Sequence, residues 1–518
     1  MELILSAGFI VAIVAWGILA PAGLAGVFDA VLAAITRNFG WFYLWVVLAL
    51  VLVALVLAAS RYGELRLGGE DEEPEFSLLA WFAMLFAAGM GIGLVFWGVA
   101  EPLSHYGEPP PGVAPRTPEA ANAAMRYSFF HWGLHPWAVY SVVALAIAFF
   151  QFRRGGPALV STAVRTLPVA GLRRLAPLAD MLAVIATAFG VAASLGMGAL
   201  QINSGLHALL GVPVGPVWQV TIIVVTTVLF LGSAVTGVAR GIKWLSSINL
   251  VLAGLLALAV LVLGPTVVII DTFTNTLGSY LSELVRMSLR MTPFRDSAWV
   301  GGWTVFYWAW WVSWSPFVGL FIARVSHGRT IREFILGTVA VPALVAFAWF
   351  SVFGGTALHL EIAQGVALSE AVAADTSTAM FTLFDALPLG ALMSGVATVL
   401  VLVFFVTSGD SATLVLGMMS TRGQEDPPAR VKIVWGLLVS GIAISLLLAG
   451  GLQAVQTATI VFALPFAGVI LLMIVALWRG VRADWADHER RERALRRRLQ
   501  ALSGGAAGES RGKGPRAP

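Results

Sequence analysis

The stretch LVLAGLLALAVLVL at residues 250–263 has no polar side chain, and it decides the class of fold. A continuous apolar run is typical of a membrane-spanning helix, whereas a β-barrel strand would alternate polar and apolar residues over about 10 positions. Stretches of roughly 20 residues with few charges recur along the whole chain. The sequence therefore predicts an all-α polytopic membrane protein with about twelve transmembrane helices.

The composition supports this class, because 58% of the 518 residues are hydrophobic and only 12% are charged. Glu2 stands where a signal peptide would carry basic residues, so we expect the first span to be retained. The absence of cysteine excludes disulfides, thiolate metal sites and cysteine nucleophiles. The predicted spans are 4–24, 41–60, 76–100, 124–152, 178–208, 215–237, 248–271, 299–323, 333–358, 387–420, 431–450 and 454–478.

Basic residues gather in alternate loops, which indicates the orientation of the chain. One set of loops holds Arg153, Arg154, Arg165, Arg173, Arg174, Arg240, Lys243, Arg324, Arg329, Arg332, Arg422, Arg430 and Lys432. The other set holds only Arg37, Arg116, Arg126, Arg286, Arg290 and Arg295. With an even number of spans, both termini are expected on the cytoplasmic side of a bacterial-type inner membrane.

The net charge of +4 comes largely from the segment after Arg479. We expect residues 479–518 to form a basic cytoplasmic tail, which either contacts anionic lipid headgroups or is simply solvated. The end of the tail, Ser503–Pro518, is rich in Gly, Ala and Pro and is predicted to be disordered. Nucleic acid is not an expected partner.

The sequence AAGMGIG at residues 87–93 carries three glycines that a simple lipid-facing helix does not need. Each glycine weakens a helix by about 1 kcal/mol relative to alanine, so we expect the helix to open here. An opened helix that is buried in protein offers free amides and carbonyls to a ligand. Close helix packing through small residues is the alternative, and the glycines alone leave both readings open.

The sequence WTVFYWAWWVSW at residues 303–314 packs five tryptophans into about three helical turns. Trp310 and Trp314 share a helix face with Tyr307, and Trp311 projects to the side. Tryptophan also anchors helices at the membrane interface, which is the reading we favour for Trp303, near the end of the span. For Trp310, Trp311 and Trp314, which lie deeper in the span, we favour a role in an aromatic cage.

A second aromatic group occurs in HWGLHPWAVY at residues 131–140, where Trp132, Trp137 and Tyr140 lie close in sequence. Pro136 is expected to kink this helix. An aromatic cage suits a trimethylammonium group, which cannot donate hydrogen bonds and gains about 2 kcal/mol or more from each desolvated cation–π contact.

The sequence FFVTSGDS at residues 404–411 places hydroxyls and an acid inside an apolar span. Thr407 and Ser408, with carbonyls from an opened helix, would give the oxygen shell that sodium prefers. The alternative is that these hydroxyls bond to their own helix or to a neighbour. His131 and His135 have the spacing of a metal-binding helix, but no third ligand is evident, and a proton-handling role stays open.

Together these motifs resemble the betaine/choline/carnitine transporters. The residues that carry the resemblance are Gly89 to Gly93 with Glu101-Pro102-Leu103, the span Trp303 to Arg324, and Thr407 to Ser411. The resemblance covers nearly the whole chain and implies a leucine-transporter-like fold with two inverted five-helix repeats. It also implies a homotrimer that carries a small zwitterionic substrate.

The resemblance implies a division of the chain into five parts. Residues 1–75 would hold two helices and an acidic cytoplasmic loop, 76–271 the first repeat, and 272–298 a periplasmic connecting helix. Residues 299–478 would form the second repeat, and 479–518 the tail.

The resemblance also implies a substrate site at mid-membrane. Its ammonium group would lie in a box of Trp132, Trp137, Tyr140, Trp310, Trp311 and Trp314. Its carboxylate would lie near the backbone of Gly89, Met90, Gly91, Ile92 and Gly93, since free amides at a half-helix N-terminus favour an anion. Choline-carrying relatives tend to place Asp at position 93, so Gly93 favours a zwitterion such as glycine betaine.

Sodium is the coupling ion that the resemblance implies, and no other cofactor is expected. One sodium site would use the carbonyls of Ala87 and Met90 with Phe404, Thr407 and Ser408. A second site would use Thr187 and Phe317, but Val191 replaces the second threonine of sodium-coupled relatives. A two-sodium stoichiometry is therefore open.

The sequence thus predicts a secondary active importer of a quaternary-ammonium solute, driven by sodium. A sodium-independent exchanger and a proton-coupled choline or carnitine carrier are the alternatives among transporters. A membrane sensor that binds quaternary ammonium without moving it is the alternative from another class. An enzyme is not expected, because Asp410 alone does not make a catalytic set of nucleophile, base and orienting residue.

Overall fold

The computed structural model describes residues 2–89, 91–236, 239–294 and 298–511, and over these residues it contains no β-strand. The long helices are α1 (Glu2–Leu19), α2 (Pro21–Ala59), α3 (Leu78–Gly89), α4 (Ile92–Gly107), α5 (Pro118–Trp132), α6 (Leu134–Ala148), α9 (Ala176–Leu210), α10 (Pro216–Thr236), α11 (Ala239–Leu263), α12 (Thr266–Ser288), α14 (Phe306–Val325), α15 (Ile331–Gln364), α18 (Gly390–Ser420) and α19 (Ala429–Arg511). The all-α class predicted from the sequence is confirmed.

Shorter helical pieces join these elements. They are α7 (Val160–Arg165), α8 (Ala170–Arg173), α13 (Ala298–Val300), α16 (Leu368–Ala374), α17 (Ala379–Asp385), the 3₁₀ turns η1 (Arg61–Glu64) and η4 (Thr376–Thr378), and the π-helical turns η2 (Phe149–Arg153) and η3 (Gly301–Val305).

Eight helices of the described part are long and apolar enough to cross a membrane, or nine if the bent pair α11–α12 is one span. The twelve predicted spans all fall on helices, but four of them are short or lie on interrupted helices. Span 4–24 corresponds to the short α1, span 76–100 to the broken pair α3–α4, and the last two spans to the two parts of α19. The predicted count of twelve is therefore not confirmed, although the polytopic class is.

Several predicted boundaries are wrong, each for a local reason. The first span ends at Leu19 because Pro21 begins α2, and proline fits the first turn of a helix. The seventh span ends at Leu263, where Gly264 and Pro265 turn the chain by 109° into α12. Helix α19 extends beyond Ser503 to Arg511, and the residues after Arg511 lie outside the described part of the chain.

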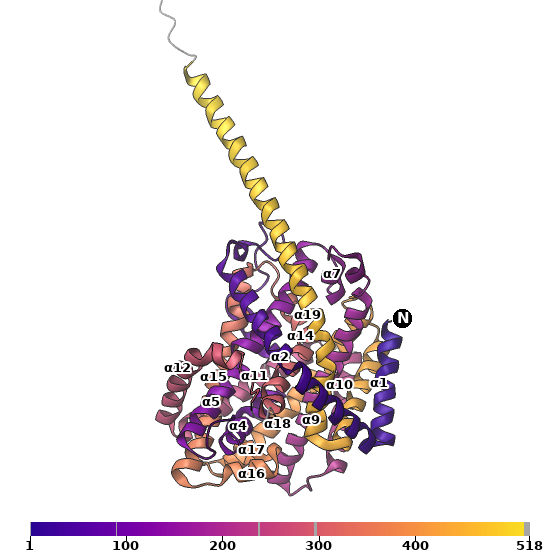
Figure 1. The fold of residues 1–518 in the computed structure, drawn as a ribbon, viewed down its shortest axis with the longest axis vertical. Coiled ribbons are helices and arrows are strands. Elements are labelled where there is room, and N and C mark those ends of the chain that lie inside the picture. The colour runs from indigo at the N-terminus through magenta and orange to yellow at the C-terminus, as the bar shows by residue number, and fades with distance from the viewer. Residues whose placement is uncertain (1, 90, 237–238, 295–297, 512–518) are drawn as a thin grey trace, which may run out of the picture.

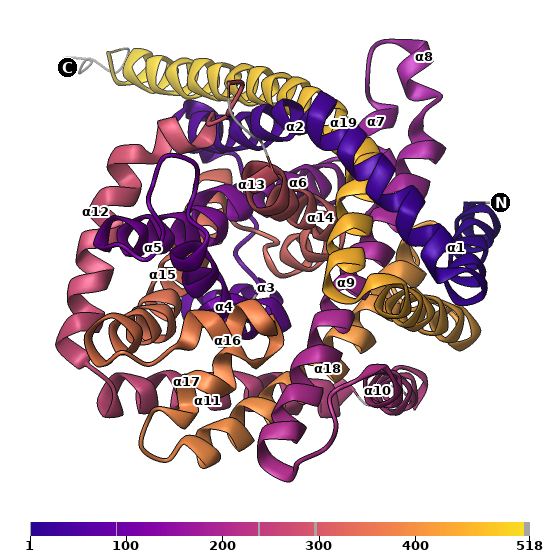
Figure 2. The same cartoon turned by 60° about the horizontal axis from the view of Figure 1, so that its bottom comes forward.

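Helix α9 lies in the middle of the bundle, where it packs against α14, α18 and α19. Helix α14 lies against α6 and α9, and α4 packs on α5 and α15 (Figures 1 and 2). Helix α12 runs along the edge of the molecule in both views. The aromatic segments on α5, α6 and α14 are therefore enclosed by neighbouring helices.

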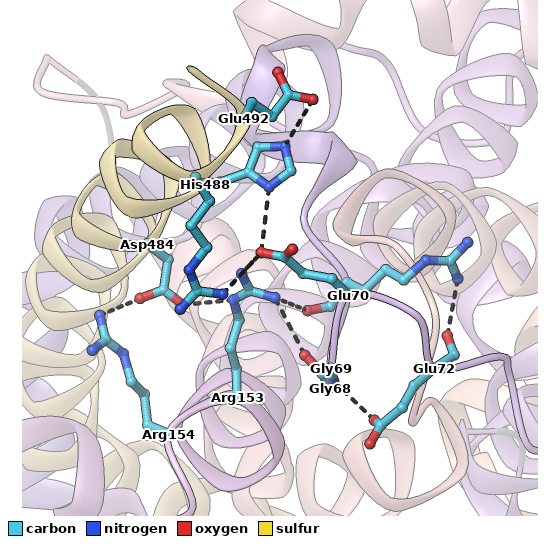
Figure 3. Close-up of polar contacts among 11 residues, drawn as sticks. Gly68, Gly69, Glu70, Glu72, Arg153, Arg154, Asp484, His488 and Glu492 are labelled. Carbon is cyan, nitrogen blue, oxygen red and sulfur yellow. Dashed lines mark hydrogen bonds and ion pairs between the residues drawn. The ribbon is translucent and has the colours of Figure 1, made fainter. Parts of the chain in front are cut away.

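Helix α19 bends at Gly450 and Gly451, where Gly451 has a positive φ of 61°, and then continues far beyond the helical body (Figure 1). Near the end of the body, Asp484 on α19 holds Arg153 at 2.5 Å and also pairs with Arg154. Glu70 of the loop after η1 lies 3.4 Å from both His488 and Arg491 of α19 (Figure 3). We call these contacts the tail anchor.

Candidate substrate site

The predicted opening of the third span is present, since α3 ends at Gly89 and α4 begins at Ile92. Gly91 has an extended backbone at this junction, with φ −148° and ψ −153°, whereas Met90 lies outside the described residues. The N–H groups of Ile92 and Gly93 precede the first backbone hydrogen bond of α4, from Leu94 to the carbonyl of Gly91 at 3.1 Å, and can receive an anion.

Gly93, in the first turn of α4, is in close contact with two tryptophans. A Cβ atom at position 93 would lie 2.4 Å from Cη2 of Trp310 and 3.2 Å from Cη2 of Trp132. Only glycine lets the helix approach the rings this closely. The opened segment and the aromatic rings predicted from separate parts of the sequence therefore meet.

A second interruption lies between α5 and α6, at Gly133, with φ −93° and ψ −133°. This interruption agrees with the prediction that Pro136 kinks the helix. Proline clashes with the carbonyl four residues before it, here that of Trp132, so the helix breaks ahead of the proline. The break brings the end of α5 and the start of α6 to the same side of α14.

Five of the six predicted rings form one buried cluster, which we call the aromatic cluster: Trp132, Trp137, Tyr140, Trp310 and Trp311. Trp132 lies with its ring centre 4.9 Å from that of Trp311, almost at right angles to it. Trp310 and Trp311 are stacked at 5.1 Å, and Tyr140 links Trp311 to Trp137. Each ring is at most 5% exposed.

The sixth ring, Trp314, packs elsewhere. Its Nε1 donates to the carbonyl of Gly190 at 2.7 Å, and its ring meets Phe317 edge-on at 5.3 Å. Trp314 therefore connects α14 to α9 beside the cluster.

The indole N–H groups fix some of these rings and leave one free. Trp311 donates from Nε1 to the carbonyl of His131 at 2.9 Å, which sets the plane of its ring. Nε1 of Trp310 is buried and has no partner. An unpaired buried donor is costly, so a ligand that accepts from Trp310 would be stabilised.

Behind the aromatic cluster lies Glu101 of α4, which is fully buried. Its Oε2 accepts from Nε1 of Trp132 at 2.8 Å and from the hydroxyl of Tyr307 at 2.5 Å. Its Oε1 lies 2.7 Å from Nδ1 of His131 and 3.2 Å from Nε2 of His105. We call these five residues the Glu101 network.

The sequence reasoning missed the role of Glu101, although a carboxylate inside an apolar span is a signal for a functional position. The spacing of His131 and His135 did not indicate their partners, which differ. His131 joins Glu101 and His105, with ligand atoms within 4.8 Å of one another, whereas His135 bonds Ser288 at 2.8 Å. The hydrogen bonds of the Glu101 network account for the group of three without a metal.

The residues predicted for the first sodium site lie on α3 and α18. Ala87 is in the last turn of α3, and Phe404, Thr407 and Ser408 lie in the middle of α18. Ile92 at the start of α4 and Phe405 of α18 both lie against Gly198 of α9, so α4 and α18 meet there. The Thr407 hydroxyl bonds to the carbonyls of Val403 and Phe404, at 2.9 and 3.2 Å.

Asn249 of α11 was not predicted at this position, yet its Nδ2 lies 3.4 Å from Oγ1 of Thr407, and its own Oδ1 is buried without a partner. For the second site, Thr187 is fully buried and its hydroxyl has no partner, while Val191 is buried beside it on α9. Phe317 lies on α14, packed against Trp314. One oxygen atom at each candidate site, Oδ1 of Asn249 at the first and Oγ1 of Thr187 at the second, is thus free to bind a cation or water.

Known proteins resemble this chain over almost its full length. A family model described as BCCT, betaine/carnitine/choline family transporter, matches residues 2–486. The glycine betaine transporter OpuD of Bacillus subtilis (strain 168) is 49% identical over 487 residues, which are 93% of this chain and 94% of that relative.

Two further relatives differ in the solutes that their names give. The ectoine/hydroxyectoine transporter of Virgibacillus pantothenticus is 47% identical over 446 residues, 86% of this chain and 89% of that protein. Glycine betaine transporter 1 of Vibrio parahaemolyticus serotype O3:K6 (strain RIMD 2210633) is 43% identical over 492 residues, 93% of each. The chain is thus a multi-pass membrane protein that belongs to the betaine/carnitine/choline family of transporters.

Proposed function

We propose that this chain imports a small zwitterionic compatible solute, with glycine betaine as the first candidate, by sodium symport. The observation that supports this most is the contact between the aromatic cluster and the opened helix at Gly93. The aromatic faces suit a trimethylammonium group, and the free N–H groups at the start of α4 suit a carboxylate about one helical turn away. Glycine betaine carries both groups.

Choline is disfavoured because the cluster offers no free counter-charge. Both oxygens of Glu101 are engaged by four donor side chains, so this carboxylate does not balance a substrate cation. Gly93 adds none. A substrate that brings its own carboxylate therefore fits better than a lone cation.

Ectoine is the second candidate substrate, because the relative from Virgibacillus pantothenticus is named for it. Ectoine is also a compact zwitterion, and its amidinium cation is planar and can stack on the indoles of Trp310 and Trp311. Both candidates use the same site, so competition between them is expected.

Sodium coupling is supported by hydroxyl groups inside apolar spans and by buried oxygen atoms that have no partner. Thr407 and Ser408 lie in the middle of α18, where Nδ2 of Asn249 is 3.4 Å from the hydroxyl of Thr407, and the hydroxyl of Thr187 has no partner. Because Val191 lacks a hydroxyl, we propose that the first site is the principal one. Exchange without sodium and proton coupling are the competing modes.

We further propose that the chain forms homotrimers, with both termini in the cytoplasm and two inverted five-helix repeats. The tail and α7 lie at the same end of the bundle (Figure 1), in agreement with the basic loops predicted to share one side. Cross-linking of the purified protein tests the trimer, and protease access to the tail in oriented vesicles tests the orientation.

The decisive experiment is uptake of labelled glycine betaine into proteoliposomes under an inward sodium gradient or an equal potassium gradient. We expect accumulation with sodium alone. Equal uptake under both gradients would reject sodium coupling but keep the substrate, and no uptake under either would reject glycine betaine. Labelled ectoine in the same vesicles then tests the second candidate.

A further inference from the structure

Ser194 of α9 carries a buried hydroxyl group that has no hydrogen-bond partner among the described residues, and the residue is only 2% exposed. A serine inside a helix can bond the carbonyl four residues earlier, as Ser351 of α15 does with Phe347 at 2.8 Å. For Ser194 this carbonyl belongs to Gly190, and it already accepts the indole N–H of Trp314 at 2.7 Å. The hydroxyl of Ser194 is therefore free to bind a ligand.

Two contacts define how α9 lies beside α4. Ile92 of α4 lies against Gly198, where a Cβ atom would be 2.9 Å from Cδ1 of the isoleucine. Three residues later in both helices, Nε2 of Gln201 donates to the carbonyl of Val95 at 3.3 Å. Because the residue numbers of the two helices increase together, α4 and α9 run parallel at this contact.

The parallel arrangement places Ser194 beside the opened segment. Ser194 precedes Gly198 by one helical turn on the same face of α9, or about 6 Å along the axis at 1.5 Å per residue. At that level α4 has not yet begun, because the helix is open between Gly89 and Ile92. The first N–H groups of a helix point out of its N-terminus, so those of Ile92 and Gly93 point toward the level of Ser194.

Two other helices approach α9 on this face, one turn before and one turn after Ser194. A Cβ atom at Gly190 would lie 2.9 Å from Cδ1 of Trp314, and one at Gly198 would lie 3.0 Å from Cδ2 of Phe405. Glycine at both positions lets α14 and α18 pack closely against α9. Ser194 therefore lies where α4, α14 and α18 meet α9, and α14 also carries Trp310 and Trp311 of the aromatic cluster.

The groups that meet at the opened segment donate hydrogen bonds, which favours an anion there over a cation. The N–H groups of Ile92 and Gly93 carry the positive end of the α4 dipole, and the hydroxyl of Ser194 is a further donor. We propose that Ser194 donates a hydrogen bond to the carboxylate of the transported zwitterion and thereby selects zwitterions over quaternary-ammonium cations that lack a carboxylate. The inference rests on the proposed import of a zwitterion and adds to that site a specificity-determining residue from α9.

Binding of two ligands to the purified full-length chain tests the proposal. Glycine betaine carries a carboxylate, whereas tetramethylammonium offers the aromatic cluster a similar cation without one. We expect Ser194→Ala to weaken glycine betaine binding about tenfold, the effect of one hydrogen bond to a charged acceptor, and to leave the inhibition constant of tetramethylammonium unchanged. Equal glycine betaine affinity in wild type and Ser194→Ala would overturn the proposal, and so would an equal loss for both ligands.

The stability of the unliganded protein distinguishes a binding role from a structural one. Ser194→Ala removes a buried hydroxyl that has no partner, so its melting temperature without ligand should equal or exceed that of wild type. A lower melting temperature together with weaker binding would overturn the proposal. Ser351→Ala is the matched control, because the Ser351 hydroxyl bonds its own helix, and it should leave the binding of both ligands unchanged.

Sodium titration distinguishes a contact to the carboxylate from a contact to the ion. We expect the tenfold difference between wild type and Ser194→Ala to persist at saturating sodium. A higher sodium requirement of Ser194→Ala, with equal glycine betaine affinity once sodium is saturating, would overturn the proposal and identify Ser194 as an ion ligand. If wild type bound no glycine betaine, the proposed substrate would be rejected and this inference with it, a result that differs from equal binding by the two forms.

Discussion

Two carboxylates of this molecule, Glu101 and Glu70, make similar contacts in opposite surroundings. Each lies against a histidine and further donors, but Glu101 is fully buried, whereas the Glu70 side chain is 40% exposed in the tail anchor (Figure 3). Water can replace any partner of Glu70, and nothing replaces the partners of Glu101. The comparison indicates that burial, more than the identity of the partners, determines how much stability is lost when a charged group is removed.

The largest effect is expected from Glu101→Ala. The change leaves Trp132, Tyr307, His131 and His105 without their shared acceptor, which we expect to cost about 3 kcal/mol or more of stability. Glycine betaine binding should be lost with it, because the ring of Trp132 is no longer held. Thermal unfolding and equilibrium binding in detergent measure the two effects.

Glu101→Gln is the control, since its amide keeps one acceptor oxygen of the same size. It should retain part of the stability. If Glu101→Ala were as stable as wild type, the Glu101 network would not support the site.

Next in size is Trp311→Leu, which removes the ring at the centre of the aromatic cluster. Loss of about 2 kcal/mol of cation–π energy corresponds to roughly 30-fold weaker binding of glycine betaine. Isothermal titration on the purified protein gives the dissociation constant. Trp218→Leu, at a 41% exposed position of α10, is the matched control, and equal losses in both variants would reject the cage.

Two substitutions of Gly93 distinguish the effect of a larger side chain from the effect of an added negative charge. Gly93→Ala places a methyl group against Trp310, and we expect 1–3 kcal/mol of overpacking, seen as about tenfold or greater loss of glycine betaine uptake. Gly93→Asp has the same contact but adds a counter-charge, so it should admit choline while Gly93→Ala does not. Choline uptake by neither variant would contradict our account of selectivity.

A smaller effect is expected at the partly buried side of the tail anchor. Asp484→Asn weakens the pairs with Arg153 and Arg154 and should lower stability by about 1 kcal/mol. Chemical denaturation detects this change. If Asp484→Asn lost as much stability as Glu101→Ala, burial would not determine the size of the effect at these two carboxylates.

The smallest effect is expected from Glu70→Gln, because its contacts to His488 and Arg491 are 3.4 Å long and open to solvent. Stability should change by less than about 0.5 kcal/mol, and the difference should vanish in high salt, which screens exposed pairs. Denaturation at low and high salt checks both statements. A salt-independent loss would place Glu70 among the structural carboxylates.

The sequence predicted the interruption of α3–α4 and most of the aromatic cluster because both arise from short motifs. Glycine spacing and aromatic content are visible within about ten residues. The Glu101 network was not predictable in this way, since Tyr307 lies 206 residues from Glu101 in the chain. Only the packing of α14 on α4 and α5 brings these groups together.

Trp314 illustrates another limit of the sequence pattern. Helical periodicity predicts that Trp314 shares a helix face with Trp310, four residues earlier, and the spacing supports this. Periodicity does not say which neighbour a face meets along its length, however, and here α9 offers the carbonyl of Gly190. The break at Gly133 falls one turn before Pro136, because the ring of this proline clashes with the carbonyl of Trp132.

The length of α19 has a mechanical consequence. From Asp484 to Arg511 the helix continues for 27 residues, or about 40 Å at 1.5 Å per residue. A tilt of about 10° at the pivot formed by Arg153 and Asp484 would move the far end by about 7 Å. The helix is a lever that magnifies small rotations of the bundle, and a fluorophore near its end would report movements too small to see at the substrate site.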